Sequence, residues 1–158
     1  MSAETLINPP SSGIYSAEER RRRDTTVWTT VQAVLAPLQF AVFLVSLGLV
    51  LWFLATGQGY LAATISIIAK TAILLTIMVT GAIWEKVVFD QWLFAPAFFW
   101  EDVVSFIVIA AHLIYLWALL AGSSPSLQMT LALIAYAAYV LNAAQFLLKL
   151  RRARLEAA

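Results

Sequence analysis

The segment Trp84–Asp102, WEKVVFDQWLFAPAFFWED, separates two long apolar stretches of this 158-residue chain and decides how the chain can fold. It combines four carboxylates and one lysine with three tryptophans and four phenylalanines. Charged side chains next to membrane-spanning segments are costly, and they are usually kept for chemistry or for binding. We therefore predict that this segment lies at a membrane surface and holds the functional site.

The composition supports a membrane protein. The chain is 62% apolar and 12% charged, whereas a soluble domain carries about 25% charged residues. It contains no cysteine, which excludes disulfides, thiolate nucleophiles, cysteine-ligated clusters and c-type haem attachment. It also lacks a Gly-rich phosphate loop, a dinucleotide fingerprint and a nucleophile elbow. The polar first 25 residues argue against a cleavable signal peptide.

Four segments are apolar and long enough to cross a membrane, which takes about 20 residues. They cover approximately residues 27–55, 61–84, 101–121 and 127–148. Pro37 predicts a kink or an interfacial break in the first segment. The predicted fold is an all-α integral membrane protein with four transmembrane helices and an aromatic-rich cytoplasmic or interfacial segment between helices 2 and 3.

The polar ends of the chain carry further signals. Residues 1–15 are predicted to form a flexible arm, which leaves residues 16–158 as a single four-helix transmembrane domain. Ser16 and Glu19 fit a capping box, so we expect a short basic helix over about residues 17–24. Ser124-Pro125 is a good N-cap and first-turn pair for the last span.

The basic residues indicate the topology. Eight of the ten lie in two clusters, which are Arg20–Arg23 and the set Lys149, Arg151, Arg152 and Arg154. Four spans place both clusters on one side, and the positive-inside rule makes that side the cytoplasm. This interpretation is stronger than nucleic-acid binding, so we expect a multi-pass protein with both termini cytoplasmic.

Three carboxylates are the candidate catalytic groups. Glu85 ends the second predicted span, while Glu101 and Asp102 begin the third, so all three lie near the same membrane face. Grouped, poorly solvated carboxyl groups can hold a proton among them, because burial and like charge both raise a carboxyl pKa. Alternatively, Glu101 and Asp102 cap a helix N-terminus and Glu85 pairs with Lys86.

Two further polar residues lie deeper in the predicted spans. His112 is three turns from Glu101 on nearly the same helix face, with Ser105 between them. It could bind a metal, including the magnesium of a chlorin, or relay protons, or simply bond a neighbouring helix. Lys70 could snorkel, pair with a carboxylate or bind an anionic substrate group. No ligand pair has the spacing of an all-protein metal site.

Amide and aromatic side chains complete the candidate substrate contacts. Asn142 and Gln145 lie one turn apart on the fourth span, where they either join helices by hydrogen bonds or line a cavity. The aromatic residues are either an interfacial belt or a stacking surface for a flat apolar ring. The candidate contacts among them are Trp84, Trp92, Phe98, Phe99 and Trp100.

The run GAIWEKVVFDQWLFAPAFFWEDVVSFIVIAAHLIYL, Gly81–Leu116, preceded by ERRRRDTTVWTTVQAVLAPLQFAVFLVSL, Glu19–Leu47, closely resembles the vinyl-bacteriochlorophyllide hydratases. The likeness covers about residues 15–148. It implies a hydro-lyase of bacteriochlorophyll synthesis in the inner or intracytoplasmic photosynthetic membrane of a bacterium. The implied reaction hydrates the C3-vinyl group of a chlorophyllide or bacteriochlorophyllide to a 1-hydroxyethyl group.

The resemblance gives the candidate residues expected roles. One of Glu85, Glu101 and Asp102 would protonate the vinyl group, and a neighbouring carboxylate would activate water. His112 would contact the substrate magnesium or relay a proton, and Lys70 would meet the propionate. No cofactor is expected beyond the magnesium of the substrate.

Partners and alternatives remain to be separated. Expected partners are the lipid bilayer, the tetrapyrrole and either other pigment-synthesis enzymes or further copies of this chain, but not nucleic acid. The first alternative is a non-catalytic tetrapyrrole-binding protein, similar in character to tryptophan-rich sensory proteins, which have five spans. The second is a carrier or scaffold subunit that passes pigment precursors between enzymes.

Overall fold

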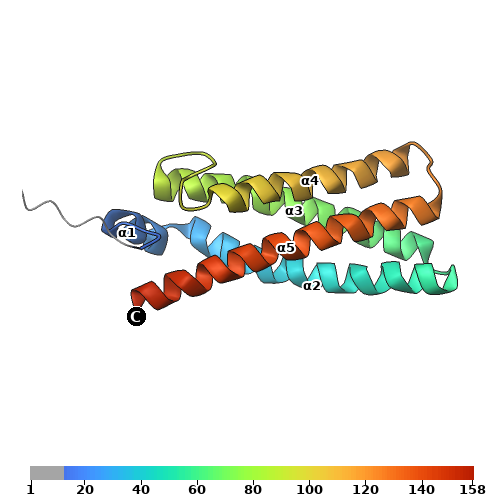
Figure 1. Cartoon of the computed structure of the whole chain (residues 1–158), viewed down its shortest axis with the longest axis horizontal. Coiled ribbons are helices and arrows are strands. Elements are labelled where there is room, and N and C mark those ends of the chain that lie inside the picture. Colours follow the sequence, from blue (N-terminus) through green and yellow to red (C-terminus); the bar gives the residue numbers. More distant parts are fainter. Residues whose placement is uncertain (1–12) are drawn as a thin grey trace, which may run out of the picture.

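The computed structural model describes residues 13–158, which form five α-helices and, within that range, no strand (Figure 1). The short helix α1, Ala17–Thr25, precedes four long helices. These are α2 (Val27–Thr56), α3 (Tyr60–Phe89), α4 (Phe99–Leu120) and α5 (Pro125–Ala157). All four are long and apolar enough to cross a membrane. The predicted fold class, a multi-pass bundle of four transmembrane helices, is confirmed.

The start of the chain follows its predicted capping signals. Ser16 is the N-cap of α1, and the reciprocal Ser16–Glu19 hydrogen bonds of a capping box are both present. Most of the arm predicted over residues 1–15 lies outside the described residues. Its last residues are held in place, since the Ile14 N–H donates to Glu156 at 2.8 Å and the Tyr15 side chain is buried.

The long helices differ in detail from the predicted spans. Of the kink or break predicted at Pro37, the break does not occur, because α2 is one continuous helix through that residue; the kink stays a prediction. Proline is tolerated in a membrane helix where neighbouring groups satisfy the freed carbonyl. Helix α3 continues beyond residue 84 to Phe89, and α5 continues beyond residue 148 to Ala157. Ser124 caps α5 and Pro125 is in its first turn, as predicted.

The turn between α2 and α3 depends on two glycines. Gly57 ends α2 with φ 72°, and Gly59 precedes α3 with φ 79°. Both values lie in the left-handed region that glycine adopts without steric cost. A Cβ on Gly59 would also collide with the indole ring of Trp52. This position therefore admits only glycine without rearrangement.

The four long helices form two hairpins, α2 with α3 and α4 with α5, which pack closely within each pair and more sparsely against each other. Buried apolar side chains from all four helices make the shared core, including Phe43, Ile67, Val108 and Tyr136. Large apolar side chains also cover the outer surface of the bundle. Such a surface is suited to lipid, in which an exposed apolar side chain carries no cost.

One end of the bundle gathers three distant parts of the chain. Figure 1 shows helix α1, the C-terminus and the connection between α3 and α4 at the same end. Arg22 of α1 donates to the Val88 carbonyl in the last turn of α3 at 3.3 Å, and Lys149 of α5 donates to the Ala97 carbonyl in the connection at 2.6 Å. The connection Asp90–Phe98 therefore lies at the same end of the bundle as α1 and the C-terminal part of α5 (Figure 1). We call this region the loop end.

Candidate active site at the loop end

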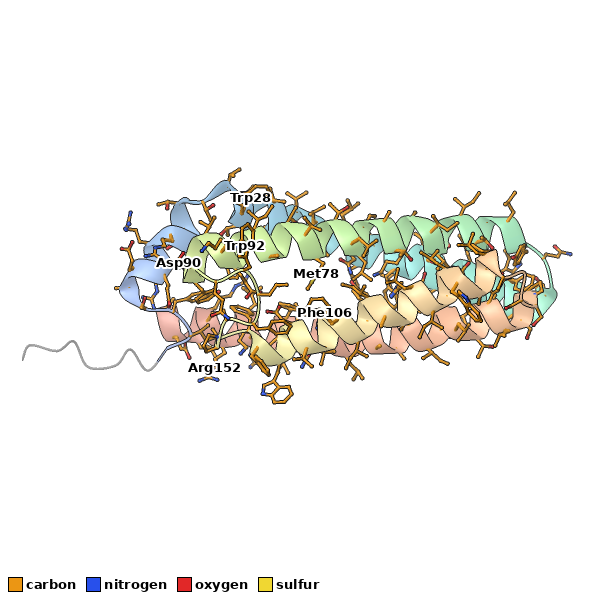
Figure 2. All side chains as sticks on the ribbon, turned by 90° about the horizontal axis from the view of Figure 1, so that it is seen from above. Trp28, Met78, Asp90, Trp92, Phe106 and Arg152 are labelled. Carbon is orange, nitrogen blue, oxygen red and sulfur yellow. The ribbon has the colours of Figure 1, made fainter. Side chains whose placement is uncertain are left out.

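Helices α3 and α4 diverge toward the loop end, and the connection 90–98 bridges them there. Figure 2 shows this wedge, with Met78 from α3 and Phe106 from α4 between the two helices. The segment Ala95-Pro96-Ala97, in which proline disfavours a helix, lies in this non-helical connection between the end of α3 at Phe89 and the start of α4 at Phe99.

The wedge contains a pair of carboxyl groups from opposite helices. Glu85 on α3 and Asp102 on α4 are both buried, and their carboxyl groups lie within hydrogen-bonding reach of each other. The bridging loop completes the arrangement. The Phe94 N–H donates to Asp102 Oδ2 at 2.8 Å, and the Ala95 N–H donates to Glu85 Oε2 at 3.2 Å. Two consecutive amides thus hold the two acids side by side.

Phe94 adopts an unusual backbone conformation to make this contact. Its φ is 59°, in the left-handed region that bulky residues rarely occupy. A non-glycine residue held there costs about 1–3 kcal/mol, and such residues cluster at functional sites. Here the conformation directs the Phe94 N–H at Asp102, so the strained backbone orients this amide toward the carboxylate.

Glu101 has a different environment from the paired acids. Its carboxylate lies 3.2 Å from Lys149 Nζ on α5. Its backbone carbonyl accepts from Asn142 Nδ2 at 3.1 Å and from Ser105 Oγ at 2.7 Å. Asn142 also bonds Gln145 and Ser105. Glu101 is thereby held in an ion pair with Lys149 that fixes α4 against α5.

Asp90, at the C-terminal end of α3, is excluded as an acid. Lys86 donates a hydrogen bond to its carboxylate at 2.8 Å, and this contact lowers the pKa of Asp90 below its usual value. The group is exposed and stays charged near neutral pH. The predicted Glu85–Lys86 pairing is not observed, since Lys86 turns to Asp90 instead.

An inner aromatic group packs the loop end. Trp84 and Phe98 meet edge to face at 5.5 Å between ring centroids, and Tyr15 stacks on Phe89 at 5.7 Å. The Trp84 indole N–H donates to Thr29 at 2.9 Å. Burial raises the pKa of the Tyr15 hydroxyl. These rings pack against one another, and the predicted substrate contacts Trp84 and Phe98 are part of this packing.

An outer aromatic group faces away from the bundle. Phe94 contacts Phe99 and Phe106 at centroid distances of 5.7 and 5.5 Å, and Phe99 contacts Trp100 at 5.2 Å. Trp100 is 67% exposed, and Trp92, two residues before Phe94 in the connection, is 60% exposed. Because the Phe94 amide bonds Asp102, this exposed aromatic surface adjoins the carboxyl pair.

The two deeper candidates form a second polar group in the middle of the bundle. Lys70 is 0% exposed and His112 is 1% exposed. Lys70 Nζ lies 3.7 Å from the centroid of the Tyr139 ring, and the His112 ring lies 5.8 Å from that of Tyr136. Neither Lys70 Nζ nor His112 Nε2 has a hydrogen-bond partner among the described residues.

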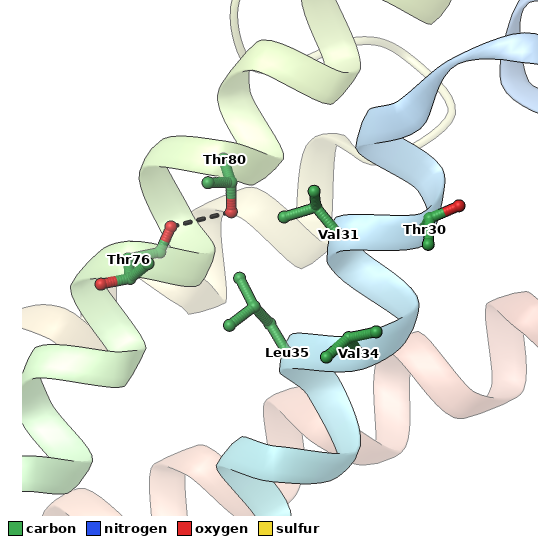
Figure 3. A pocket seen from close by; sticks show the side chains of 6 residues that line it. All are labelled: Thr30, Val31, Val34, Leu35, Thr76 and Thr80. Atoms are coloured by element: carbon green, nitrogen blue, oxygen red, sulfur yellow. Dashed lines mark hydrogen bonds between the residues drawn. The ribbon is translucent and has the colours of Figure 1, made fainter.

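A groove between α2 and α3 is separate from these groups. Figure 3 shows its lining, and its volume is about 400 Å³. The Thr80 hydroxyl in this lining donates to the Thr76 carbonyl at 2.8 Å and accepts from Gln32 at 2.7 Å. With its polar atoms satisfied internally, the groove offers a ligand only an apolar surface. The lining residues are Thr30, Val31, Val34, Leu35, Thr76 and Thr80.

The structure thus separates the predicted site residues by depth. The three carboxylates, the two amides and the aromatic residues lie at the loop end, while Lys70 and His112 lie in the middle of the bundle. Sequence reasoning missed Lys149 as a site residue because it was assigned to a topology-determining cluster. Its spacing of seven from Asn142, which places both on one helix face, was the signal that could have found it.

Comparison with known proteins identifies the family. Residues 15–152 match the family of 2-vinyl bacteriochlorophyllide hydratases. A protein of that name from Cereibacter sphaeroides is 68% identical over 147 residues, covering 93% of this chain and 92% of the relative. Another from Rhodobacter capsulatus is 68% identical over 151 residues, covering 96% and 88%. No solved structure matches the chain. The chain belongs to the 2-vinyl bacteriochlorophyllide hydratase family.

Proposed function

We propose that this protein is a hydro-lyase of bacteriochlorophyll biosynthesis, which adds water across the vinyl group of a chlorophyllide or bacteriochlorophyllide. The product carries a 1-hydroxyethyl group. The vinyl group numbered 2 in the family name is the C3-vinyl group of the proposed substrate. Family membership over residues 15–152 supports the reaction. The observation that carries the mechanism is the buried Glu85–Asp102 pair bridged by two loop amides.

The pair supplies the acid. A hydrogen bond between two carboxyl groups requires one proton, and the hydrophobic wedge disfavours two negative charges side by side. The shorter amide bond goes to Asp102, which better stabilises negative charge there. We therefore place the shared proton on Glu85. Glu101, held by Lys149, acts as a positioning residue.

The reaction then needs two proton movements. Glu85 gives its proton to the terminal vinyl carbon, and the positive charge on the adjacent carbon is delocalised into the macrocycle. Water adds at that adjacent carbon and passes a proton to the carboxylate pair. One water is consumed and the pair regains its proton, so no redox partner or resident cofactor is required.

The macrocycle would enter between α3 and α4 beside the outer aromatic group, with its vinyl edge directed at the carboxyl pair. Trp92, Phe99 and Trp100 offer exposed ring faces for stacking there. His112 is suited to contact the substrate magnesium, since its Nε2 is unpartnered and its Nδ1 lies 2.8 Å from the Val108 carbonyl. Its depth makes a direct proton relay to Glu85 less suitable.

The cellular setting follows from the same reasoning. Four apolar helices and bacterial relatives place the protein in a bacterial membrane. We propose the cytoplasmic or intracytoplasmic membrane, with the loop end and both termini in the cytoplasm, because the basic residues gather there. Association with other pigment-synthesis enzymes, or between copies of this chain, would pass the poorly soluble substrate directly to the site.

The test is to incubate membranes containing this protein with a 3-vinyl chlorophyllide and to follow absorption and mass. A blue shift of the red absorption band with the gain of one water establishes the hydratase. The Cereibacter sphaeroides relative serves as the positive control. Pigment that stays bound but unaltered, under conditions in which that relative is active, would indicate a carrier instead.

A further inference from the structure

Lys70 brings an ammonium group into the middle of the bundle without a counter-ion among residues 13–158. Its side chain is fully buried, and its Nζ makes no hydrogen bond there. The contact with the face of the Tyr139 ring, at 3.7 Å, offsets only part of the cost of burial. An isolated buried charge is expensive, so buried charges in proteins are normally paired.

The neighbours of Lys70 cannot supply the missing negative charge. His112 Nδ1 lies 2.8 Å from the carbonyl oxygen of Val108, which can only accept a hydrogen bond. Nδ1 therefore carries the ring proton, and in the neutral ring Nε2 is an acceptor without charge. Tyr136 and Tyr139 contribute aromatic faces. None of these neighbours supplies an anion, so a carboxylate bound at Lys70 would complete an ion pair that the described residues leave open.

The position of Lys70 fits one end of a ligand held at the carboxyl pair. Tyr139 lies one helical turn, about 5 Å, from Asn142, and Asn142 bonds the backbone carbonyl of Glu101. The Lys70 ammonium therefore lies deeper in the bundle than the acids. Glu85 and Lys70 both belong to α3, while Asp102 belongs to α4, so a flat ligand between these helices would reach both levels.

We propose that Lys70 binds the free propionate carboxylate of the substrate and thereby makes the enzyme select the free acid over its ester. This inference rests on the proposed hydratase function, and it adds the residue that sets the substrate class. A carboxylate completes an ion pair in a low-dielectric site. An ester has no charge and leaves the ammonium group unpaired, which penalises binding.

The test compares binding of 3-vinyl chlorophyllide with binding of its methyl ester. Affinities are measured on the detergent-solubilised full chain by quenching of tryptophan fluorescence. We expect the wild-type protein to bind the free acid about 10- to 100-fold more tightly, as for one charge-assisted hydrogen bond. Lys70→Met should bind both compounds with the affinity that the wild type has for the ester. Lys70→Gln is measured in parallel, so a folding defect in one variant leaves the other readable.

Lys86→Met is the matched control, because Lys86 is an exposed lysine of the same helix paired with Asp90. It should keep the wild-type preference, which separates the proposed contact from general attraction of an anion by positive charge. A wild-type protein without preference, or Lys70 variants with the full preference, would overturn the proposal. Preference that depends on Lys70 without hydration would support this inference and contradict the proposed function. Hydration without such a preference would support the proposed function and overturn this inference.

Discussion

The loop end and the middle of the bundle both bury polar side chains, but they satisfy them differently. At the loop end Asp102 and Glu85 accept backbone amides, and Glu101 pairs with Lys149. In the middle, Lys70 Nζ and His112 Nε2 have no partner among the described residues. A buried polar group without a partner costs more than the same group hydrogen-bonded. The carboxylates of the loop end therefore have their partners before a ligand arrives, whereas we propose that a ligand supplies the partner of Lys70.

The largest expected effect comes from breaking the carboxyl pair. Glu85→Gln keeps the shape of the side chain and removes the transferable proton, so kcat for hydration should fall about 10²- to 10⁴-fold. The kcat of Asp102→Asn should fall by a factor in the same range. Glu101→Gln, outside the pair, should retain activity within about 10-fold of wild type. A wild-type rate for Glu85→Gln, followed by absorption and mass, would refute the assignment.

Removing a satisfied partner at the loop end should destabilise the protein. Lys149→Met leaves the Glu101 carboxylate and the Ala97 carbonyl without their shared cation. Breaking a fully buried pair costs 3–5 kcal/mol, and since this one is partly exposed we expect about 2 kcal/mol. Thermal unfolding in detergent measures the loss. Lys86→Met, which breaks an exposed pair, should unfold at the wild-type temperature; equal melting of all three proteins would contradict the prediction.

Replacing a lysine by methionine in the middle of the bundle should stabilise the protein, whereas the same replacement at the loop end should destabilise it. Lys70→Met replaces an unpartnered ammonium with an apolar side chain of similar length, so the ligand-free protein should gain about 1–3 kcal/mol. The melting temperature in detergent should rise while binding of the free acid weakens. A lower melting temperature would mean that Lys70 stabilises the bundle, and the contrast between the two regions would be lost.

The smallest effect is expected at the outer aromatic surface. Trp100→Leu removes one exposed stacking face, and an aromatic contact is worth about 0.5–1.5 kcal/mol. We therefore expect KM to rise about 2- to 10-fold with kcat unchanged, because the ring contributes equally to ground state and transition state. Trp117→Leu, equally exposed near the other end of α4, is the control and should leave both constants unchanged. A fall in kcat alone would place Trp100 in the chemistry.

The helices could be predicted because the membrane imposes a simple rule of length and hydropathy. The errors come from tertiary contacts. The predicted second span ends at Trp84, just before the charged residues Glu85 and Lys86, yet α3 continues to Phe89 with Glu85 buried. That burial depends on Asp102 and on two loop amides, none of which is a helical neighbour of Glu85.

The candidate site shows the same limit. The carboxylates were predictable as a group, since each lies where a span meets the loop. Their division into a pair bridged by loop amides and a separate ion pair was not, because it depends on which carboxylate meets Lys149 across the helix interface. The opposite packing of Trp84 and Trp100, one inward and one outward, likewise depends on the path of the loop.

The seam between the two hairpins has a consequence for biogenesis. Each hairpin can enter the bilayer with its own backbone hydrogen bonds satisfied, and helices associate only afterwards. Glu85 arrives with the first hairpin, while Asp102 and Lys149 arrive with the second. Under the proposed mechanism the carboxyl pair forms only when the two hairpins associate, so a newly inserted but unassembled chain would not hydrate the pigment precursor.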